Sequence, residues 1–298
     1  MAVVGSANLD LVVDVNQIPL VGETVMGGDL HRYPGGKGAN QAVAAARLDR
    51  SVAMIGRLGD DEGGAILRAA LESDAIDTSH LLTTDGVPNG VALISVDSGG
   101  DNAIVVSPGA NARLSPADIV AANAVLAAAT VTLLQLEVPL ETVEAAAAAA
   151  TGTVILNPAP APTEPLPDTL LRNIDVLVPN QTEFATLTGH EGPIDAAVAA
   201  ELAGILPSPA VVITLGAEGA LVVVSGVATH VAAPVVEPVD TTAAGDSFCG
   251  ALADALVGGA SIVEAAEWAV CVGAATTQRQ GAQPSLPTRD EVESLLRP

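Results

Sequence analysis

The sequence contains few aromatic and few basic side chains. Its 298 residues include one Trp, one Tyr and two Phe, and 11 Lys and Arg stand against 35 Asp and Glu. The formal net charge at pH 7 is therefore -24. A surface with this charge repels phosphate backbones and anionic lipid headgroups, so we exclude nucleic acids and membrane surfaces as partners.

Cysteine is also scarce, and no targeting segment is evident. Cys249 and Cys271 fall in predicted helices, and neither they nor the four scattered histidines have the spacing of a metal site or a disulfide framework. Both thiols are expected to be small packing residues in the reducing cytoplasm. The chain begins with a strand pattern rather than a basic, apolar leader. Residues 119–136 are uncharged and long enough to span a membrane, but polar residues and a break at 129–130 divide them into a helix and a strand.

A long alternation of strand and helix patterns predicts the fold. The sequence is 49% hydrophobic, which is enough for a large buried core. Nearly continuous apolar strands, each followed by a helical pattern, indicate an α/β fold with a doubly wound, mostly parallel sheet covered on both faces. The strands are expected at residues 3–7, 52–55, 131–136, 154–156, 175–178, 211–215 and 221–224.

Two segments interrupt this alternation. Residues 11–33 and 89–106 contain short extended stretches joined by Gly, Pro and turn sequences, which are typical of antiparallel β ribbon. We expect them to form one small β-sheet lid, inserted into a body made of residues 1–10, 34–88 and 107–298. Ligands of doubly wound sheets lie beyond the carboxyl ends of the strands, so one shared cleft is expected there.

The stretch most indicative of function covers residues 239–248. Small residues at its centre open an apolar helical pattern, and the N–H groups at the positive end of such a helix bind phosphate oxygens. Asp246 lies in the first helical turn, where an Asp is also a favourable capping residue. Taken alone, the stretch fits an ordinary helix start as well as a phosphate site.

Polar residues also follow other predicted strands. Asn8 and Asp10 come directly after the first strand and could hold a polyhydroxylated ligand, or simply form an Asx turn. Glu137 ends a core strand, either as a ligand contact or as an ordinary charge at a helix start. The glycine-rich residues 35–40 allow backbone to approach a small ligand and contain Lys37, the only lysine in the chain. This stretch matches neither a Walker loop nor a dinucleotide fingerprint.

Two further stretches could contact a nucleotide. Asn180 and Glu183 open a predicted helix after another strand, where an amide and a carboxylate suit the hydration shell of Mg²⁺. A plain N-cap followed by an acid explains the same pattern. Residues 214–219 form a strand end, a tight turn and a strand start, which could wrap a nucleotide or be an ordinary hairpin.

The order of these motifs is more informative than any one of them. Asn-x-Asp at 8–10, Gly-Gly-Lys-Gly-Ala-Asn at 35–40, Asn-x-x-Glu at 180–183 and Asp-Thr-x-Ala-Ala-Gly-Asp at 240–246 follow one another along the chain. In this order and at these separations they resemble the PfkB family of carbohydrate kinases, most of all its ribokinase branch, over essentially the whole chain.

The resemblance implies a role for each candidate residue. Asp246 would be the general base that takes the proton of the sugar hydroxyl, beside a backbone anion hole formed by Ala243, Ala244 and Gly245. The sugar pocket would consist of Asn8, Asp10, Gly36, Lys37, Gly38, Ala39, Asn40 and Glu137, with Asp246. ATP would contact Asn180, Thr214, Leu215, Gly216, Ala217, Glu218, Gly219 and Gly245, and Glu183 would order Mg²⁺ through water. The activating monovalent cation, K⁺, would be bound by Asp240, Thr242, Thr276, Arg279, Gly281 and Ser285.

The resemblance also implies a reaction and an assembly. The reaction would be ATP-dependent phosphorylation of D-ribose at O5, with a lid that closes over the substrates and a homodimer in which two lids pack together. The scarcity of aromatic rings fits a small pentose better than a nucleoside. A kinase for 2-deoxyribose, a ketohexose or a nucleoside is an alternative, as is a non-catalytic sugar sensor, although the intact Asp246 argues against the sensor. We add the hypothesis that the Lys37 ammonium reaches the transferred phosphoryl group when the lid is closed.

Two positions depart from the family's pattern. Glu218 places an acid in the nucleotide turn where a base is common, which would weaken ATP affinity. Val270 stands where a more polar residue often borders the adenine. The resemblance therefore supports the nucleotide contacts less strongly than the other parts of the site.

Overall fold

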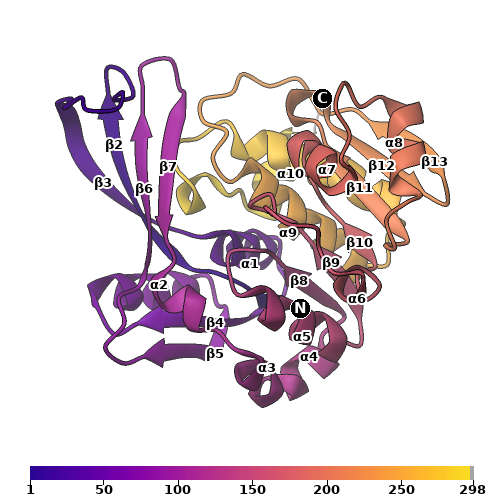
Figure 1. The fold of residues 1–298 in the computed structure, drawn as a ribbon, viewed down its shortest axis with the longest axis horizontal. Helices are drawn as coiled ribbons and strands as arrows, with labels where there is room; N and C mark the ends of the chain where they lie inside the picture. Colours follow the sequence, from indigo (N-terminus) through magenta and orange to yellow (C-terminus); the bar gives the residue numbers. More distant parts are fainter. Residues whose placement is uncertain (296–298) are drawn as a thin grey trace.

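The computed structural model describes residues 1–295 and contains a large, mostly parallel sheet (Figure 1). The strand order in this sheet is β13-β12-β11-β10-β9-β8-β1-β4-β5. All strands from β5 to β11 in this order run parallel, while β12 and β13 are antiparallel to their neighbours. The strands are β1 (Ala2–Val4), β4 (Ala53–Gly59), β5 (Asp77–Thr84), β8 (Val131–Leu134), β9 (Thr153–Leu156), β10 (Val176–Leu177), β11 (Ala210–Thr214), β12 (Ala220–Val224) and β13 (Val227–Val231).

Helices cover both faces of this sheet, which confirms the predicted doubly wound fold. One face packs against α1 (Lys37–Arg47), α2 (Glu62–Ser73), α9 (Ala244–Val257), α10 (Ile262–Thr276) and α11 (Arg289–Leu295). The other packs against α3 (Pro116–Ala121), α4 (Asn123–Ala128), α5 (Leu140–Ala149), α6 (Asp168–Leu171), α7 (Gln181–Thr188) and α8 (Ala196–Ala203). Because successive strand residues point to opposite faces, strands buried on both sides are apolar throughout.

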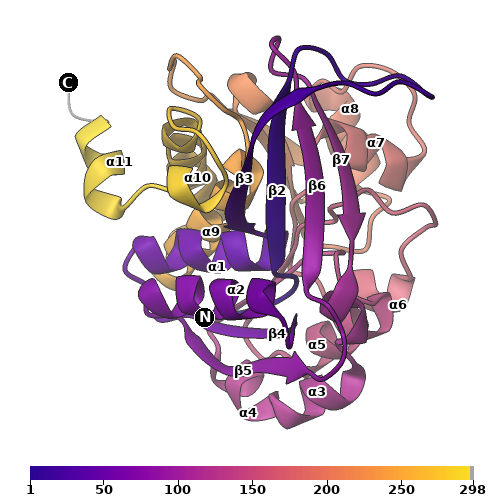
Figure 2. The same cartoon turned by 90° about the vertical axis from the view of Figure 1, so that its left-hand side faces the viewer.

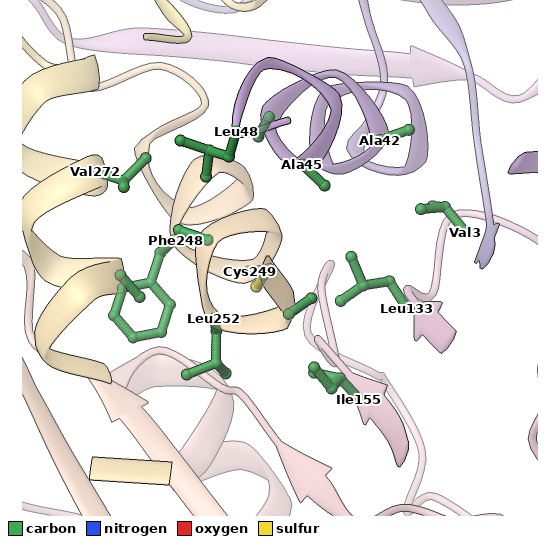
Figure 3. Close-up of a cluster of buried hydrophobic side chains, with 14 of the residues drawn as sticks. Val3, Ala42, Ala45, Leu48, Leu133, Ile155, Phe248, Cys249, Leu252 and Val272 are labelled. Carbon is green, nitrogen blue, oxygen red and sulfur yellow. The ribbon is translucent and has the colours of Figure 1, made fainter. Parts of the chain in front are cut away.

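The core on the first face joins the two helices that matter most for the site. Figure 3 shows Val3, Leu133 and Ile155 of the sheet beneath side chains of α1 and α9. Phe248 and Leu252 of α9 are 4% and 0% exposed, so the helix that begins beside Asp246 is held firmly against the sheet. Burial of one such large side chain contributes about 2 kcal/mol to the free energy of unfolding.

A second, four-stranded sheet stands beside the body (Figure 1) and is seen face-on in Figure 2. Its order is β3-β2-β6-β7, with β2 (Asn8–Val15), β3 (Gly27–Gly35), β6 (Gly90–Val96) and β7 (Asn102–Ser107). β2 pairs antiparallel with β3 and parallel with β6. We refer to these four strands as the lid sheet. The limits of the lid as a domain stay a prediction.

Three local predictions were wrong. The first strand ends at Val4, and Asn8 and Asp10 instead begin β2 of the lid sheet. The helical pattern of residues 40–48 predicts a helix that begins at residue 40, whereas α1 begins at Lys37, so the glycine-rich stretch supplies its first turn. β5 and β13 were not predicted, because both are edge strands with many exposed polar residues and lack the apolar signature of the central strands.

The uncharged stretch at 119–136 divides as predicted, into parts of α3, α4 and β8. Over residues 1–295, no helix combines the length and the apolar character that a membrane crossing needs. Cys249 and Cys271 lie in α9 and α10 as predicted, and both are free thiols.

Candidate active site

Two helices bring the central side chains of the site together. α1 begins after Gly36, whose φ of 89° places it in the left-handed region, and α9 begins after Ala243, whose φ is 60°. The helices touch at Gly250, where an added Cβ would lie 2.7 Å from Cβ of Ala44. Only glycine permits this approach, which lets side chains on the first turn of α1 reach the first turn of α9.

The side chains from the first turns of α1 and α9 meet at Asp246. Asp246 is 7% exposed, and its carboxylate accepts a hydrogen bond from Asn40 Nδ2 at 2.9 Å through Oδ2. Gln41 Nε2 donates to Oδ1 of the same carboxylate at 3.2 Å. Each carboxylate oxygen therefore has one amide donor from α1 and keeps acceptor capacity for a further donor.

Glu137 is the centre of a second hydrogen-bond cluster nearby. Its Oε2 accepts from Ser6 Oγ at 2.5 Å, from the backbone N–H of Lys37 at 3.2 Å and from Asn8 Nδ2 at 3.4 Å. The Asn8 amide is oriented in turn by Asn111 Nδ2, which donates to its Oδ1 at 2.7 Å. The structure thus joins Asn8, Lys37 and Glu137, which the sequence placed far apart.

Asp10 lies on the lid sheet and faces this cluster. It is 8% exposed, and burial, together with the nearby carboxylates of Glu137 and Asp246, raises its pKa to about 7, against the opposing effect of Lys37. Asn40 Oδ1 is buried and accepts no hydrogen bond within residues 1–295. A buried carboxyl group and an unpaired amide oxygen are groups that a hydroxylated ligand would satisfy.

The raised pKa of Asp10 leads to a stability prediction. Since the folded carboxyl keeps its proton up to about pH 7 and the unfolded one titrates near 3.8, the folded state binds more protons between these values and loses stability as pH rises. The loss at pH 8 is about 4 kcal/mol at most. Asp10→Asn should therefore raise Tm relative to the parent at pH 8 and much less at pH 4, as measured by calorimetry without ligand. Asp14→Asn, on the exposed part of the same strand, is the control. An increase in Tm for Asp10→Asn that is the same at pH 4 and at pH 8 would contradict this explanation.

Two hollows meet at Thr241, near the start of α9. A cavity of about 240 Å³ is lined by Lys37, Asn180, Glu183, Thr214, Gly245 and Asp246, among others. A larger cleft of about 1090 Å³ separates the lid sheet from residues 238–242 and 280–282, and Asp10 and Tyr33 lie on its wall. Thr241 lines both. A ligand in the cleft would therefore meet a ligand in the cavity that Asp246 lines.

Lys37 is the cation of the smaller cavity. Burial lowers its pKa, but the carboxylates of Asp246, Glu137 and Glu183 outweigh burial and raise it, so the ammonium is charged at neutral pH. Burial raises the pKa of Glu183, which is 6% exposed. The cavity is thus lined by one cation, Lys37, and by the carboxylates of Glu183 and Asp246. An anion such as a phosphate bound there would be attracted by Lys37 and repelled by the two carboxylates.

Asn180 and Glu183 form a capping box at the start of α7. Asn180 Oδ1 accepts from the backbone N–H of Glu183 at 2.8 Å, and Glu183 Oε2 accepts from the backbone N–H of Asn180 at 2.9 Å. The plain helix-start alternative is therefore present in the structure. It leaves Asn180 Nδ2 and the second carboxylate oxygen for other contacts, so it does not exclude a ligand role.

The turn at 214–219 lies beside this capping box. The backbone N–H of Thr214 donates to the carbonyl of Pro179 at 2.9 Å, which continues the sheet toward Asn180. Thr214 lines the smaller cavity, and a 3₁₀ turn, Gly216–Glu218, follows. An added Cβ on Gly219 would lie 2.0 Å from the carbonyl oxygen of Val231, so the turn is tightly packed against β13.

The six positions expected to hold a monovalent cation lie around the start of α9. Asp240 accepts from the backbone N–H of Thr242 and of Gly281, each at 2.8 Å, and so ties the 240–242 loop to the 281 loop. The Arg279 guanidinium is paired with Glu291 at 2.8 Å, the Ser285 hydroxyl donates to the carbonyl of Ala282, and the Thr276 hydroxyl lies 2.8 Å from Ser247 Oγ on α9. Because a guanidinium has no oxygen, a contact from Arg279 to a cation would have to come from its backbone carbonyl.

Several residues at the site were missed as site residues by the sequence analysis. They are Ser6, Tyr33, Gln41, Asn111 and Gln135. Gln41 directly follows the glycine-rich motif and is fully buried among alanines of α1, so a polar residue in an otherwise apolar helical face was the available signal. Nothing in the local sequence indicates that Ser6 or Asn111 contacts Glu137 or Asn8.

The fold and this site together define a class of protein. A carboxylate at a helix N-terminus, in a cavity that adjoins a polar cleft at the carboxyl edge of a doubly wound sheet, suits an enzyme that transfers a phosphoryl group to a small alcohol, because the helix N-terminus can bind phosphate oxygens and the carboxylate can accept the proton of the alcohol. A family model described as pfkB family carbohydrate kinase matches residues 1–289. The chain belongs to the pfkB family of carbohydrate kinases.

Individual relatives agree with this assignment. The chain is 40% identical to a ribokinase of Haemophilus influenzae, over 99% of this chain and 98% of the relative. It is 37% identical to a deoxyribokinase of Salmonella typhimurium, with the same coverage. A solved structure of Arabidopsis thaliana ribokinase complexed with ribose and ATP superposes with a TM-score of 0.86, at 32% identity, covering 99% of this chain and 98% of that one.

Proposed function

We propose that the protein is a ribokinase, which transfers the γ-phosphoryl group of ATP to O5 of D-ribose and releases ADP and D-ribose 5-phosphate. The observation that carries the proposal is the position of Asp246, which Asn40 and Gln41 hold on the wall of the cavity beside Lys37; this cavity meets the cleft beside Asp10 at Thr241. The curated ribokinase relatives and the structure of one of them with ribose and ATP support it.

In the proposed mechanism, ribose occupies the cleft and ATP reaches the smaller cavity from the side of Asn180 and Thr214. Asp246 accepts the proton of the ribose O5 hydroxyl while the O5–Pγ bond forms and the bond from Pγ to the bridging oxygen of ADP breaks. Backbone N–H groups at residues 243–245 and the Lys37 ammonium stabilise the transferred phosphoryl group. Asn8, Asp10, Asn40 and Glu137 orient the sugar hydroxyls, because they present both donors and acceptors.

Two cations belong to the proposal. Glu183 and the nucleotide phosphates would hold Mg²⁺ through water, and this ion would offset phosphate charge. The cluster of three or more Asp, Glu, His or Cys side chains that marks an all-protein metal site is absent from residues 1–295. The paired loops joined by Asp240 would hold K⁺ through carbonyl oxygens and keep the start of α9 ordered. The hydrogen bonds to Asp240 hold the pKa of its carboxyl below the usual value, although burial opposes them, so it stays charged beside a cation.

The experiment that tests the function compares sugars. ADP release should be measured with ATP, Mg²⁺ and either D-ribose, 2-deoxyribose or fructose, each with K⁺ and with Na⁺. We expect kcat/KM to be highest for ribose and to rise with K⁺. Because a deoxyribokinase is among the relatives, a higher kcat/KM for 2-deoxyribose would replace ribose by deoxyribose as the substrate. The reaction is proposed to occur in the cytoplasm, which the two free thiols support.

A homodimer is also part of the proposal. Leu30, Leu93 and Val105 lie on the face of the lid sheet that points away from the cleft, and they are 54%, 50% and 65% exposed. An apolar sheet face of this kind is typical of a subunit interface. We expect the parent to sediment as a dimer and Leu93→Asp to sediment as a monomer. A parent that stays monomeric at micromolar concentration would contradict this assembly.

A further inference from the structure

The residue after Asn40 has no role in the proposed mechanism, although it touches the same carboxylate. Gln41 is fully buried, and its Nε2 donates to Asp246 Oδ1 at 3.2 Å and to Asn157 Oδ1 at 3.3 Å. Both N–H bonds of this amide are thereby used. A long polar side chain buried in an Ala-rich helix loses hydration and rotamer freedom, so its retention at this position calls for a physical reason.

The orientation of Gln41 is fixed from the other end. Gln135 Nε2 donates to Gln41 Oε1 at 2.7 Å, and Asn157 Nδ2 donates to the backbone carbonyl of Val178 at 2.9 Å. The amides therefore have one consistent direction, from Gln135 to Gln41 and on to Asp246 and Asn157. Turning the Gln41 amide over would place its oxygen against the Asp246 carboxylate and its nitrogen against the Gln135 nitrogen.

This chain of amides connects the rigid part of the fold with the proposed base. Gln135, Asn157 and Val178 follow β8, β9 and β10, three neighbouring parallel strands at the centre of the large sheet. Gln41 lies on α1 and Asp246 on α9, which approach each other closely at Gly250. The Asp246 carboxylate is thus held in position by residues at the carboxyl ends of the sheet strands, and not only by its own helix.

We propose that Gln41 is a positioning residue that fixes the plane of the Asp246 carboxylate for proton removal, and that Gln135 and Asn157 hold Gln41 in the orientation this needs. The inference rests on the proposed function, in which Asp246 is the general base. With Asn40 on Oδ2 and Gln41 on Oδ1, the carboxylate cannot rotate about its Cβ–Cγ bond without breaking both hydrogen bonds. Its remaining acceptor capacity is then available in the cavity that Asp246 lines, where the hydroxyl of a sugar bound at the adjoining cleft would reach it.

The chemistry predicts a distinctive pattern of effects. Without the Gln41 donor, the Asp246 carboxylate can turn about its Cβ–Cγ bond, so it is less often aligned with the hydroxyl whose proton it removes, and the chemical step should slow. Ribose and ATP touch other groups, so binding should change little.

The test compares Gln41→Leu, Gln135→Leu and Thr132→Val with the parent in ribose phosphorylation. Thr132 is a matched control, because it is fully buried on β8 and its hydroxyl bonds to nothing in the described part of the chain. We expect kcat to fall about 10- to 100-fold in Gln41→Leu, with KM for ribose and ATP within about threefold of the parent. Gln135→Leu should show the same changes at a smaller size, and Thr132→Val none.

Each outcome has one reading. An active parent with an unchanged kcat in Gln41→Leu overturns the positioning role, and so does a loss of activity confined to KM. If Gln41→Leu does not fold, Gln135→Leu decides, since it leaves the contact with Asp246 in place and removes only its support. A parent that does not phosphorylate ribose contradicts the proposed function itself and removes the inference with it.

Discussion

Asp246→Asn should lower kcat for ribose phosphorylation by about 10³-fold, within the range of roughly 10²–10⁴ expected for loss of a general base. The asparagine has nearly the same shape, but its amide takes up no proton at neutral pH. One of the two hydrogen bonds from α1 is also lost, because an amide nitrogen cannot accept. Affinities for ribose and ATP, measured by calorimetric titration, should stay within a few fold of the parent.

Asp254→Asn is the matched control, because Asp254 lies two turns further along the same helix. It is 1% exposed and paired with Arg50 and Arg289, and it accepts from Trp268 Nε1 at 2.9 Å. The same substitution there should cost roughly 3 kcal/mol of the free energy of unfolding and leave kcat at low temperature unchanged. If Asp246→Asn retains most of its activity, or if both variants lose kcat equally, Asp246 is not the base.

Lys37→Met should lower kcat by about 10²-fold, which is the size of effect seen when one preorganised group that stabilises developing charge is removed. The ammonium lies in the cavity with Asn180, Glu183 and Asp246, and three nearby carboxylates keep it charged despite its burial. Methionine retains much of the side-chain volume and removes only the charge. KM for ribose should rise less than kcat falls, as measured by steady-state kinetics with both substrates varied.

The control for Lys37→Met removes a cation elsewhere. Arg172 is 70% exposed and pairs with Asp168 on the surface, so Arg172→Met should change neither kcat nor Tm appreciably. A Lys37→Met variant with normal turnover and normal ribose affinity would disprove the hypothesis that this ammonium reaches the phosphoryl group. It would leave the role of Asp246 untouched.

The sequence was sufficient for the architecture, because the central strands carry their own signal. The strands at 131–134 and 153–156 are apolar apart from one threonine each, as is typical of strands buried on both faces. The edge strands β5 and β13 carry no such signal, since one side of each is exposed and polar. Periodicity therefore predicted the middle of the sheet and missed its margins.

The glycine-rich stretch shows why local propensity placed α1 wrongly. Gly36 and Gly38 look like loop residues, because glycine disfavours helix. In the structure, a Cβ on Gly38 would lie 2.7 Å from the backbone nitrogen of Ser6, so close packing against the 5–6 segment requires glycine within the helix. Tertiary contact outweighs propensity at this position, and it brings Lys37 and Asn40 to the site.

The hydrogen-bond chain around Asp246 could not be predicted from the sequence, for a different reason. Gln41 and Asp246 are 205 residues apart, and Gln135 is 94 residues from Gln41. Motif order predicted that Asn40 and Asp246 share a site, but spacing along the chain carries no information about which amide donates to which oxygen. The assignment of roles to individual site residues accordingly stays a proposal that the variants above test.

The most direct test of the central claim is to follow the reaction by ³¹P NMR with ATP, Mg²⁺, K⁺ and D-ribose, using Asp246→Asn as the blank. The account predicts that the γ-phosphate signal of ATP is replaced by that of a phosphate ester on O5 of ribose, in equal amount to the ADP formed, and that the blank forms neither at a comparable rate. Release of free inorganic phosphate without the ester, or an ester formed equally fast by Asp246→Asn, would contradict it.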